Sequence, residues 1–422
     1  MDAIQLTGDN ELHQRAKNHR KAQIKGQFTI QEINAYNYQG ETPLITAVKR
    51  RATTVVKQLI EWQADTNMQD SQGNTALHFA IQELEYNIVD ILCNAGANST
   101  IFNKKGESSI HLAAQLANPK ILTTIMQTSV LAKFNLDTPD AEGNTPLLIA
   151  VNNQKTKTAA WLAKAAANRL VTDKDGNMPL HRATLLGNSI LVQTVIHTVA
   201  LGHRNNEGDT PIMLAVKTGN GEIFESLLLS TSQMAPLDRH GNTLLHLACI
   251  PESGIILSFI LRGKMVPIEE KNAEGSTALH LACKQNNISA AKCLALYGAC
   301  FNVDDKLGQT PLMAAVANGN NQMMEFLLRY PAGSAMMTIN TQDFSGTTAL
   351  HLCAIFNKIE MARLLVAFGA DTKIKNQNGQ TAADIIWSNS TQQLDQYPDI
   401  LSILDVPVLG KTENVDSQAD PM

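Results

Sequence analysis

The chain of 422 residues contains few aromatic residues, few charged residues and few cysteines. Aromatic residues make up 5% of it and charged residues 17%, where about a quarter is usual for the latter. The formal net charge of −5 gives no general attraction to nucleic acid, so we expect no nucleic-acid partner. The six cysteines lack the paired spacing of a zinc site or a disulfide framework. We therefore expect free thiols in a reducing compartment and no metal ion.

The sequence also lacks the segments and motifs that define several other protein classes. It has no run of about 18 apolar residues and no apolar N-terminal leader, which predicts a cytoplasmic protein without a membrane span. The motifs of serine hydrolases, zinc proteases and kinases do not occur. Residues 409–412 (LGKT) end like a phosphate-binding loop, but Asp405 stands where that loop needs its first glycine. We expect no enzyme activity and no cofactor.

What the sequence does contain is an internal repeat. The pattern G-x-[T/S/M]-x-[L/I/A] occurs eleven times, with successive glycines 32 to 38 residues apart and most often 33. The marker glycines are Gly40, Gly73, Gly106, Gly143, Gly176, Gly208, Gly241, Gly275, Gly308, Gly346 and Gly379. A period near 33 residues predicts a repeat architecture.

The residue types in each copy predict a turn followed by two short antiparallel helices. The marker glycine suits the positive φ of a tight turn. Thr310 suits a helix N-cap and Pro311 the first helical position. Gly319-Asn320 suits a left-handed C-cap, after which a second apolar run follows. Leucine and alanine at helical spacing supply the packed face of the first helix.

These copies resemble the ankyrin repeat, whose Thr-Pro-Leu-His-x-Ala pattern and 33-residue period they share. The resemblance covers about residues 34–393 and implies an all-α ankyrin-repeat solenoid of about eleven helix-turn-helix repeats with hairpin-like tips. Departures occur at Met178 (for Thr), Leu244 (for Pro) and Ala383-Asp384 (for Leu-His).

One histidine recurs at the same place in six copies. Read alone, His280 and Cys283 could be half of a metal site or a nucleophile with its base. The recurrence favours a structural part, and the resemblance implies that this histidine ties neighbouring repeats together. The six are His78, His111, His181, His246, His280 and His351.

The ends of the chain differ in character from the repeats. We expect a basic capping helix within residues 1–33, the array at 34–393, a closing helix at 394–409 and a disordered polar tail at 410–422. Basic residues near the N-terminus form either a patch for an acidic peptide or anionic lipid, or a plain solvated cap. They are Arg15, Lys17, Arg20, Lys21, Lys25, Lys49, Arg50 and Arg51.

By resemblance, partners bind the concave side of the solenoid, at the tips and at the ends of the first helices. Large apolar residues at such positions predict either a partner site or packing on an adjacent repeat. They are Tyr38, Leu116, Leu185, Leu186, Leu307, Phe344, Ile355 and Phe356. Two long spacings add loops at 128–139 and 330–337, which serve recognition or reflect neutral drift.

The leading hypothesis is a monomeric, non-catalytic scaffold that binds one or more proteins. Its Asn- and Gln-rich surface resembles ankyrin effectors that intracellular bacteria deliver into the host cytoplasm. The alternative is an endogenous cytosolic or nuclear adaptor, or an inhibitor of a regulatory protein. A third hypothesis, an enzyme within the degenerate central repeats, has no candidate residues.

Overall fold

The computed structural model describes residues 10–18, 26–128, 135–230, 237–250, 253–330 and 339–389. In these ranges every regular element is a helix and no strand occurs, which confirms the all-α fold class. No helix of the described part is long and apolar enough to cross a membrane. The expected closing helix and polar tail, much of both long loops, and Arg20, Lys21 and Lys25 lie outside the described residues.

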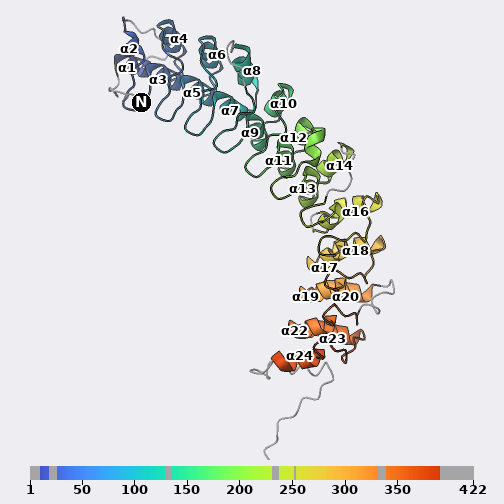
Figure 1. The fold of residues 1–422 in the computed structure, drawn as a ribbon. Coiled ribbons are helices and arrows are strands. Elements are labelled where there is room, and N and C mark those ends of the chain that lie inside the picture. Colours follow the sequence, from blue (N-terminus) through green and yellow to red (C-terminus); the bar gives the residue numbers. More distant parts are fainter. Residues whose placement is uncertain are drawn as a thin grey trace, which may run out of the picture. The chain divides into compact units, whose positions relative to one another are not determined.

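The chain forms two compact units, residues 1–215 with 222–232, and residues 216–221 with 233–422. Within each unit the first helices of the repeats form one row and the second helices another (Figure 1). The first helices are α3 (Pro43–Lys49), α5 (Ala76–Gln82), α7 (Ser109–Ala114), α9 (Pro146–Asn152), α11 (Pro179–Leu185), α13 (Pro211–Lys217), α15 (Leu244–Leu247), α17 (Ala278–Lys284), α19 (Pro311–Ala317), α22 (Ala349–Ile355) and α24 (Ala382–Asn389).

The second helices follow them in the same order. They are α4 (Thr53–Glu61), α6 (Tyr86–Asn94), α8 (Lys120–Thr128), α10 (Thr156–Lys164), α12 (Ser189–Val195), α14 (Gly221–Ser230), α16 (Gly254–Arg262), α18 (Ile288–Leu296), α20 (Asn321–Arg329) and α23 (Ile359–Ala367). A short 3-10 helix, η1 (Thr198–Gly202), follows α12, while α1 (Glu11–Asn18) and α2 (Ile30–Ile33) precede the first predicted repeat.

Each tip is a tight turn closed by an acidic or amide side chain. In the ninth repeat Gly308 has φ +78° and donates its N–H to the Asp305 carbonyl at 3.0 Å. The Asp305 carboxylate accepts the N–H groups of Leu307 and Gln309 at 2.9 and 3.0 Å. A Cβ at Gly308 would lie 2.8 Å from the Phe344 nitrogen, so the tip requires glycine both for its φ and for the close approach of the next tip.

The predicted caps are confirmed. The Thr310 hydroxyl accepts the N–H of Met313 at 3.4 Å, with Pro311 at the first helical position of α19. Gly319 (φ +70°) ends that repeat's first helix with a bond from the Asn320 N–H to the Ala315 carbonyl, 3.0 Å long. The departures are local, because Met178 still donates its N–H to His181 at 3.2 Å.

Most successive tips are joined by a backbone hydrogen bond. In the second unit Lys306 N–H donates to the Glu274 carbonyl at 3.0 Å, Phe344 N–H to the Leu307 carbonyl at 3.0 Å, and Gln377 N–H to the Ser345 carbonyl at 2.9 Å. In each of these bonds the donor is the residue two before a marker glycine, and the acceptor is the residue just before the marker glycine of the previous repeat. The turns are therefore linked by main-chain groups, and every residue type except proline can supply the donor N–H.

The N-terminal helix α1 has the geometry of a further repeat. His13 Nδ1 lies 2.6 Å from the acceptor Oδ1 of Asn10. Its Nε2 lies 2.9 Å from the carbonyl of Glu41, the residue after the marker glycine Gly40. Leu12 and Ala16 are buried. The stretch from Gly8 to Leu12 fits the repeat pattern with Asn10 in place of threonine, 32 residues before Gly40. The expected cap thus begins, in its described part, as a first helix in register with the array.

Candidate interaction surface

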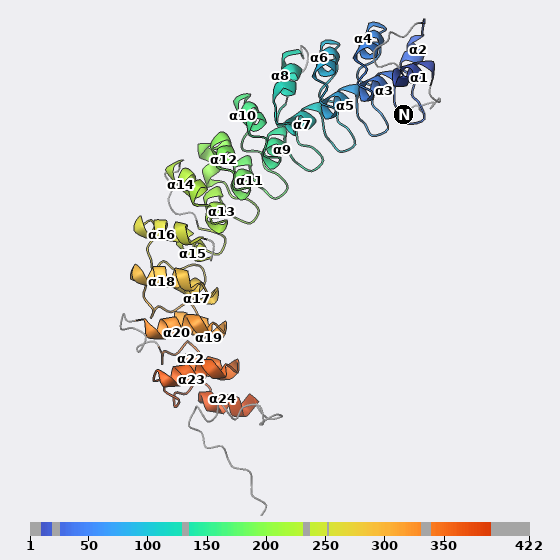
Figure 2. The same cartoon turned by 180° about the vertical axis from the view of Figure 1, so that it is seen from behind.

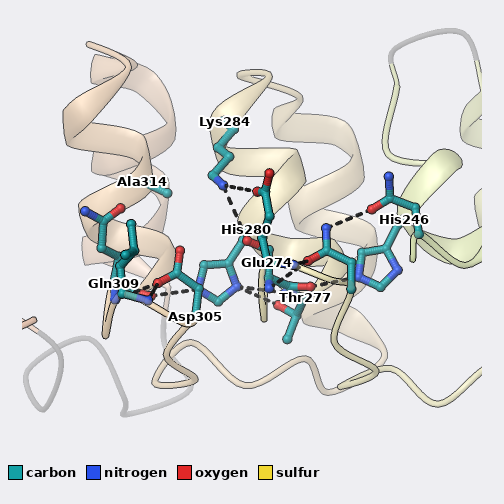
Figure 3. A network of polar contacts seen from close by, with 12 residues as sticks. His246, Glu274, Thr277, His280, Lys284, Asp305, Gln309 and Ala314 are labelled. Atoms are coloured by element: carbon teal, nitrogen blue, oxygen red, sulfur yellow. Dashed lines mark hydrogen bonds and ion pairs between the residues drawn. The ribbon is translucent and has the colours of Figure 1, made fainter. Parts of the chain in front are cut away.

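The recurring histidine lies inside the fold and uses both ring nitrogens. The Thr277 N–H donates to Nδ1 of His280 at 3.1 Å, so Nδ1 is the unprotonated nitrogen. Nε2 then carries the proton and donates to the Gln309 carbonyl of the next repeat at 3.0 Å (Figure 3). The ring therefore caps its own helix and ties it to the following tip.

The same arrangement holds at the other five histidines. All six are almost completely buried, and burial lowers the pKa of each below its ordinary value. His111 differs in its acceptor: its Nε2 lies 2.9 Å from the carbonyl of Thr138, which precedes the next marker glycine in the repeat with the long spacing. A neutral imidazole with both nitrogens engaged is neither a general base nor a metal ligand in this geometry.

The thiol of the His280-x-x-Cys283 stretch is equally enclosed. Cys283 and Cys249 are completely buried, which raises the pKa of each thiol far above its ordinary value. Across the described residues, no group of three His, Cys, Asp or Glu side chains is placed to hold a metal ion. The side chains with reactive chemistry serve the packing of the repeats.

Large apolar side chains lie exposed on the tips and first helices, which we call the tip face. Tyr38 is 77% exposed, Leu307 64% and Phe344 65%. Leu307 and Phe344 occupy adjacent tips joined by the backbone bond between them, and the Phe344 ring lies over Gly308. These two predicted residues form one apolar patch.

The other predicted residues lie at the far ends of first helices. Ile355 and Phe356 are exposed where α22 ends, about 10 Å of helix away from the Phe344 tip. Leu185 and Leu186 are exposed at the end of α11, whereas Leu116 is half-buried. The structure thus groups these residues as Leu307–Phe344, Ile355–Phe356 and Leu185–Leu186.

Acidic partners balance much of the predicted basic patch. Arg15 pairs with Glu11, and Lys49 lies 2.6 Å from a Glu41 carboxylate oxygen. Arg51 bonds Glu83 at 2.6 Å and lies 3.5 Å from Glu85. Lys17 is half-buried and Arg50 is exposed. Binding of an acidic peptide or a lipid headgroup by these residues remains a prediction.

Sequence reasoning missed two hollows on the second-helix side. One, of about 340 Å³, includes Arg169 and His197, but the Arg169 guanidinium already donates to the carbonyls of Ala163 and Ile196. The other, of about 460 Å³, lies between α18 and α20. Neither involves the positions at which the family resemblance implies contacts, so only packing reveals them.

Comparison with known proteins agrees with this geometry. The family model described as "Ankyrin repeats (3 copies)" matches residues 3–103, 110–199, 186–268 and 252–337, and "Ankyrin repeats (many copies)" matches 337–386.

Two curated relatives illustrate the similarity. The chain is 35% identical over 218 residues to the B-cell lymphoma 3 protein homolog of Mus musculus, covering 50% of this chain and 48% of that protein. It is 28% identical over 302 residues to the NF-kappa-B inhibitor cactus of Drosophila yakuba, covering 64% and 61%. The chain therefore spans about half the length of the mouse relative.

A crystal structure of the ankyrin repeat domain of Bcl-3 shares 30% sequence identity with the chain. It covers 55% of this chain and 99% of its own, with a TM-score of 0.44. With the family models matching almost the whole of residues 3–386, the chain belongs to the ankyrin-repeat family.

Proposed function

We propose that this protein is a monomeric, non-catalytic scaffold that binds a partner protein through its tip face. The observation that carries the proposal is the exposure of Leu307 and Phe344 side by side on adjacent tips. Aromatic and aliphatic side chains held on a rigid surface are typical anchors of protein interfaces. Ile355 and Phe356 extend the same face along α22.

The interior supports a binding role in place of catalysis. The six recurrent histidines cap their helices and hydrogen-bond to the next tip. The cysteines of first helices that carry such a histidine are buried. The exposed side chains of the tip face instead vary from copy to copy, from Tyr38 to Lys306 to Phe344. A constant scaffold with a variable surface suits recognition.

Two kinds of partner follow from different observations. The 28% identity to an NF-kappa-B inhibitor favours an adaptor or inhibitor of a regulatory protein in the cytosol or nucleus, with an NF-kappa-B-like protein as the first candidate. The Asn- and Gln-rich composition supports the other reading, a secreted bacterial effector that engages a protein in the host cytoplasm.

The test compares two triple variants in affinity capture. Phe344→Ala, Ile355→Ala, Phe356→Ala removes the tip-face side chains. Ile190→Ala, Leu229→Ala, Ile255→Ala removes three apolar side chains of second helices that are at least 63% exposed, and serves as the control. Purified NF-kappa-B protein and eukaryotic cell lysate are the two sources of partner, and circular dichroism verifies folding.

We expect the tip-face variant to lose at least about tenfold in affinity for the captured partner, with the control unchanged. Capture of purified NF-kappa-B protein supports the inhibitor reading, and capture of an unrelated host protein supports the effector reading. Equal binding by both variants contradicts a tip-face site.

A further inference from the structure

The hollow between α18 and α20 is an open groove on the second-helix side of the second unit. The two helices are neighbours in the row opposite α17 and α19 (Figure 2). The groove of about 460 Å³ has Ile288 and Lys292 of α18 on its wall, and Phe326 of α20 with the adjacent Tyr330 on its floor. It therefore lies on a different surface from the tip face.

Three aromatic rings make the floor of the groove rigid. Phe326 and Tyr330 have ring centroids 5.4 Å apart, and each packs on Phe301, at 6.4 and 5.3 Å. Phe301 is 5% exposed, whereas Phe326 and Tyr330 are half-buried and face the groove. Edge and tilted contacts of this kind hold the rings in place, so an apolar ligand finds a preformed platform.

The charge of the groove is positive at one point. Glu325 and Arg329 pair with each other at 2.9 Å and nearly cancel. Lys292 is exposed and forms no ion pair within the described part of the chain. In a molecule of net charge −5, this unneutralised ammonium beside an aromatic floor favours a ligand that brings a carboxylate.

On α18, side chains spaced one helical turn apart form the wall of the groove and continue beyond it. Ile288 and Lys292 line the groove, and Leu296 lies one turn beyond Lys292, outside the groove lining and 78% exposed. A nine-residue helix is about 13 to 14 Å long, so this side of α18 offers an apolar, a cationic and an apolar position over about two and a half turns.

We propose that this groove binds an acidic amphipathic segment of a partner protein. An apolar side chain of the segment packs on Phe326 and Tyr330, its carboxylate pairs with Lys292, and a second apolar side chain one turn away covers Leu296. This is helix-in-groove recognition, with the acidic residue supplying orientation. The groove acts as a second docking surface and does not depend on the tip face.

The test selects ligands from a phage-displayed library of random short peptides on the full-length protein. Enriched peptides are synthesised and titrated against the wild type, Lys292→Glu, Leu296→Ser and the tip-face triple variant. Lys157→Glu on α10 is the matched control, since it makes the same charge change at an exposed second-helix position. Lys292 and Leu296 are exposed, so both substitutions leave the fold intact.

The expected peptides carry Asp or Glu one helical turn from an aromatic residue or leucine. Lys292→Glu is expected to weaken them by about tenfold or more and Leu296→Ser by about fivefold, with Lys157→Glu unchanged. Peptides that bind Lys292→Glu like the wild type overturn the proposal. If those peptides are lost in the tip-face variant, the proposed function stands and only the groove is excluded. Self-association of the protein that Lys292→Glu abolishes also overturns it, because the occupant is then a second copy.

Discussion

The eighth and ninth repeats form the same helix pair with different residues at the same position. In the eighth, His280 caps α17 and donates to the Gln309 carbonyl of the next tip. In the ninth, Met313 fills that place, 1% exposed, and the cap rests on the Thr310 hydroxyl and Pro311 alone. The tie to the tenth tip is then the backbone bond from Phe344 to Leu307.

The difference shows that a repeat can lack the side-chain bond where a main-chain bond joins its tip to the next. A buried imidazole adds a directional bond, but it must stay neutral because burial opposes its charge. Methionine adds only apolar contact and is indifferent to pH. Repeats that bear histidine should therefore be the ones that respond to acid.

The largest expected effect is a loss of stability as the pH falls below 6.5. The folded pKa of all six recurrent histidines is lowered from the model-peptide value of 6.5, so the unfolded chain takes up protons first as the pH falls. The stabilisation is complete above pH 6.5 and is lost as the pH falls toward the folded pKa values. Each pKa unit of difference at each histidine is worth about 1.4 kcal/mol.

Urea unfolding followed by circular dichroism at a series of pH values measures this loss. The ordinary pKa of carboxyl groups lies near 4, so their titration falls below the window. A midpoint that stays constant from pH 7 to 5 contradicts the histidine explanation.

The next effect isolates one hydrogen bond between repeats, that from His280 to the Gln309 carbonyl. His280→Ala removes the cap and the donor to Gln309 and leaves a cavity, and we expect it to lower the free energy of unfolding by about 3 kcal/mol. His280→Met converts the eighth repeat to the pattern of the ninth, with an expected loss of about 1.5 kcal/mol and a shallower pH dependence.

Met313→Leu is the control for these two variants, because it keeps volume and apolarity, and it should cost less than about 1.5 kcal/mol. Denaturant unfolding at pH 7.5 ranks the three. A loss in Met313→Leu as large as in His280→Ala would refute the distinction between the two repeats.

The smallest effect concerns the main-chain tie of the ninth repeat. Gly308→Ala places a Cβ 2.8 Å from the Phe344 nitrogen at a φ of +78°, and about 2 kcal/mol of destabilisation is expected. Gly379→Ala meets no described atom within 4 Å at a φ of +75°, so only the backbone strain of about 1 kcal/mol applies. Melting temperatures of both variants test the order, and equal values argue against tip-to-tip contact.

Most of the fold could be predicted from the sequence because each repeat carries its own local instructions. Gly308, Thr310 and Pro311 specify a turn and a helix start without reference to distant residues. A capping helix was predicted here, but its register as a further first helix was not, because Asn10 stands where the pattern required Thr, Ser or Met, although asparagine is an equally good N-cap. His13 lies 32 residues before Ile45, which holds the place of the recurring histidine in the first copy, and this spacing was available as a further indication.

The surfaces were less predictable. Periodicity placed Leu307 and Phe344 on tips, but only the three-dimensional arrangement shows that a backbone hydrogen bond joins them while Ile355 lies a helix length away. The groove at Lys292 depends on how α18 and α20 pack, and no spacing within one repeat encodes it. Sequence periodicity describes a single repeat, whereas such sites arise where neighbouring repeats pack together.

The backbone bond between tips gives the array an unusual freedom to change. Tyr38, Lys306 and Phe344 occupy the same position in three copies, two of them bonded through N–H groups that do not depend on the side chain. Mutation at that position therefore keeps the main-chain bond while it changes the side chain that the tip presents to solvent. Under the function proposed above, a lineage could exchange one binding specificity for another through single substitutions at this position, without passing through unstable intermediates.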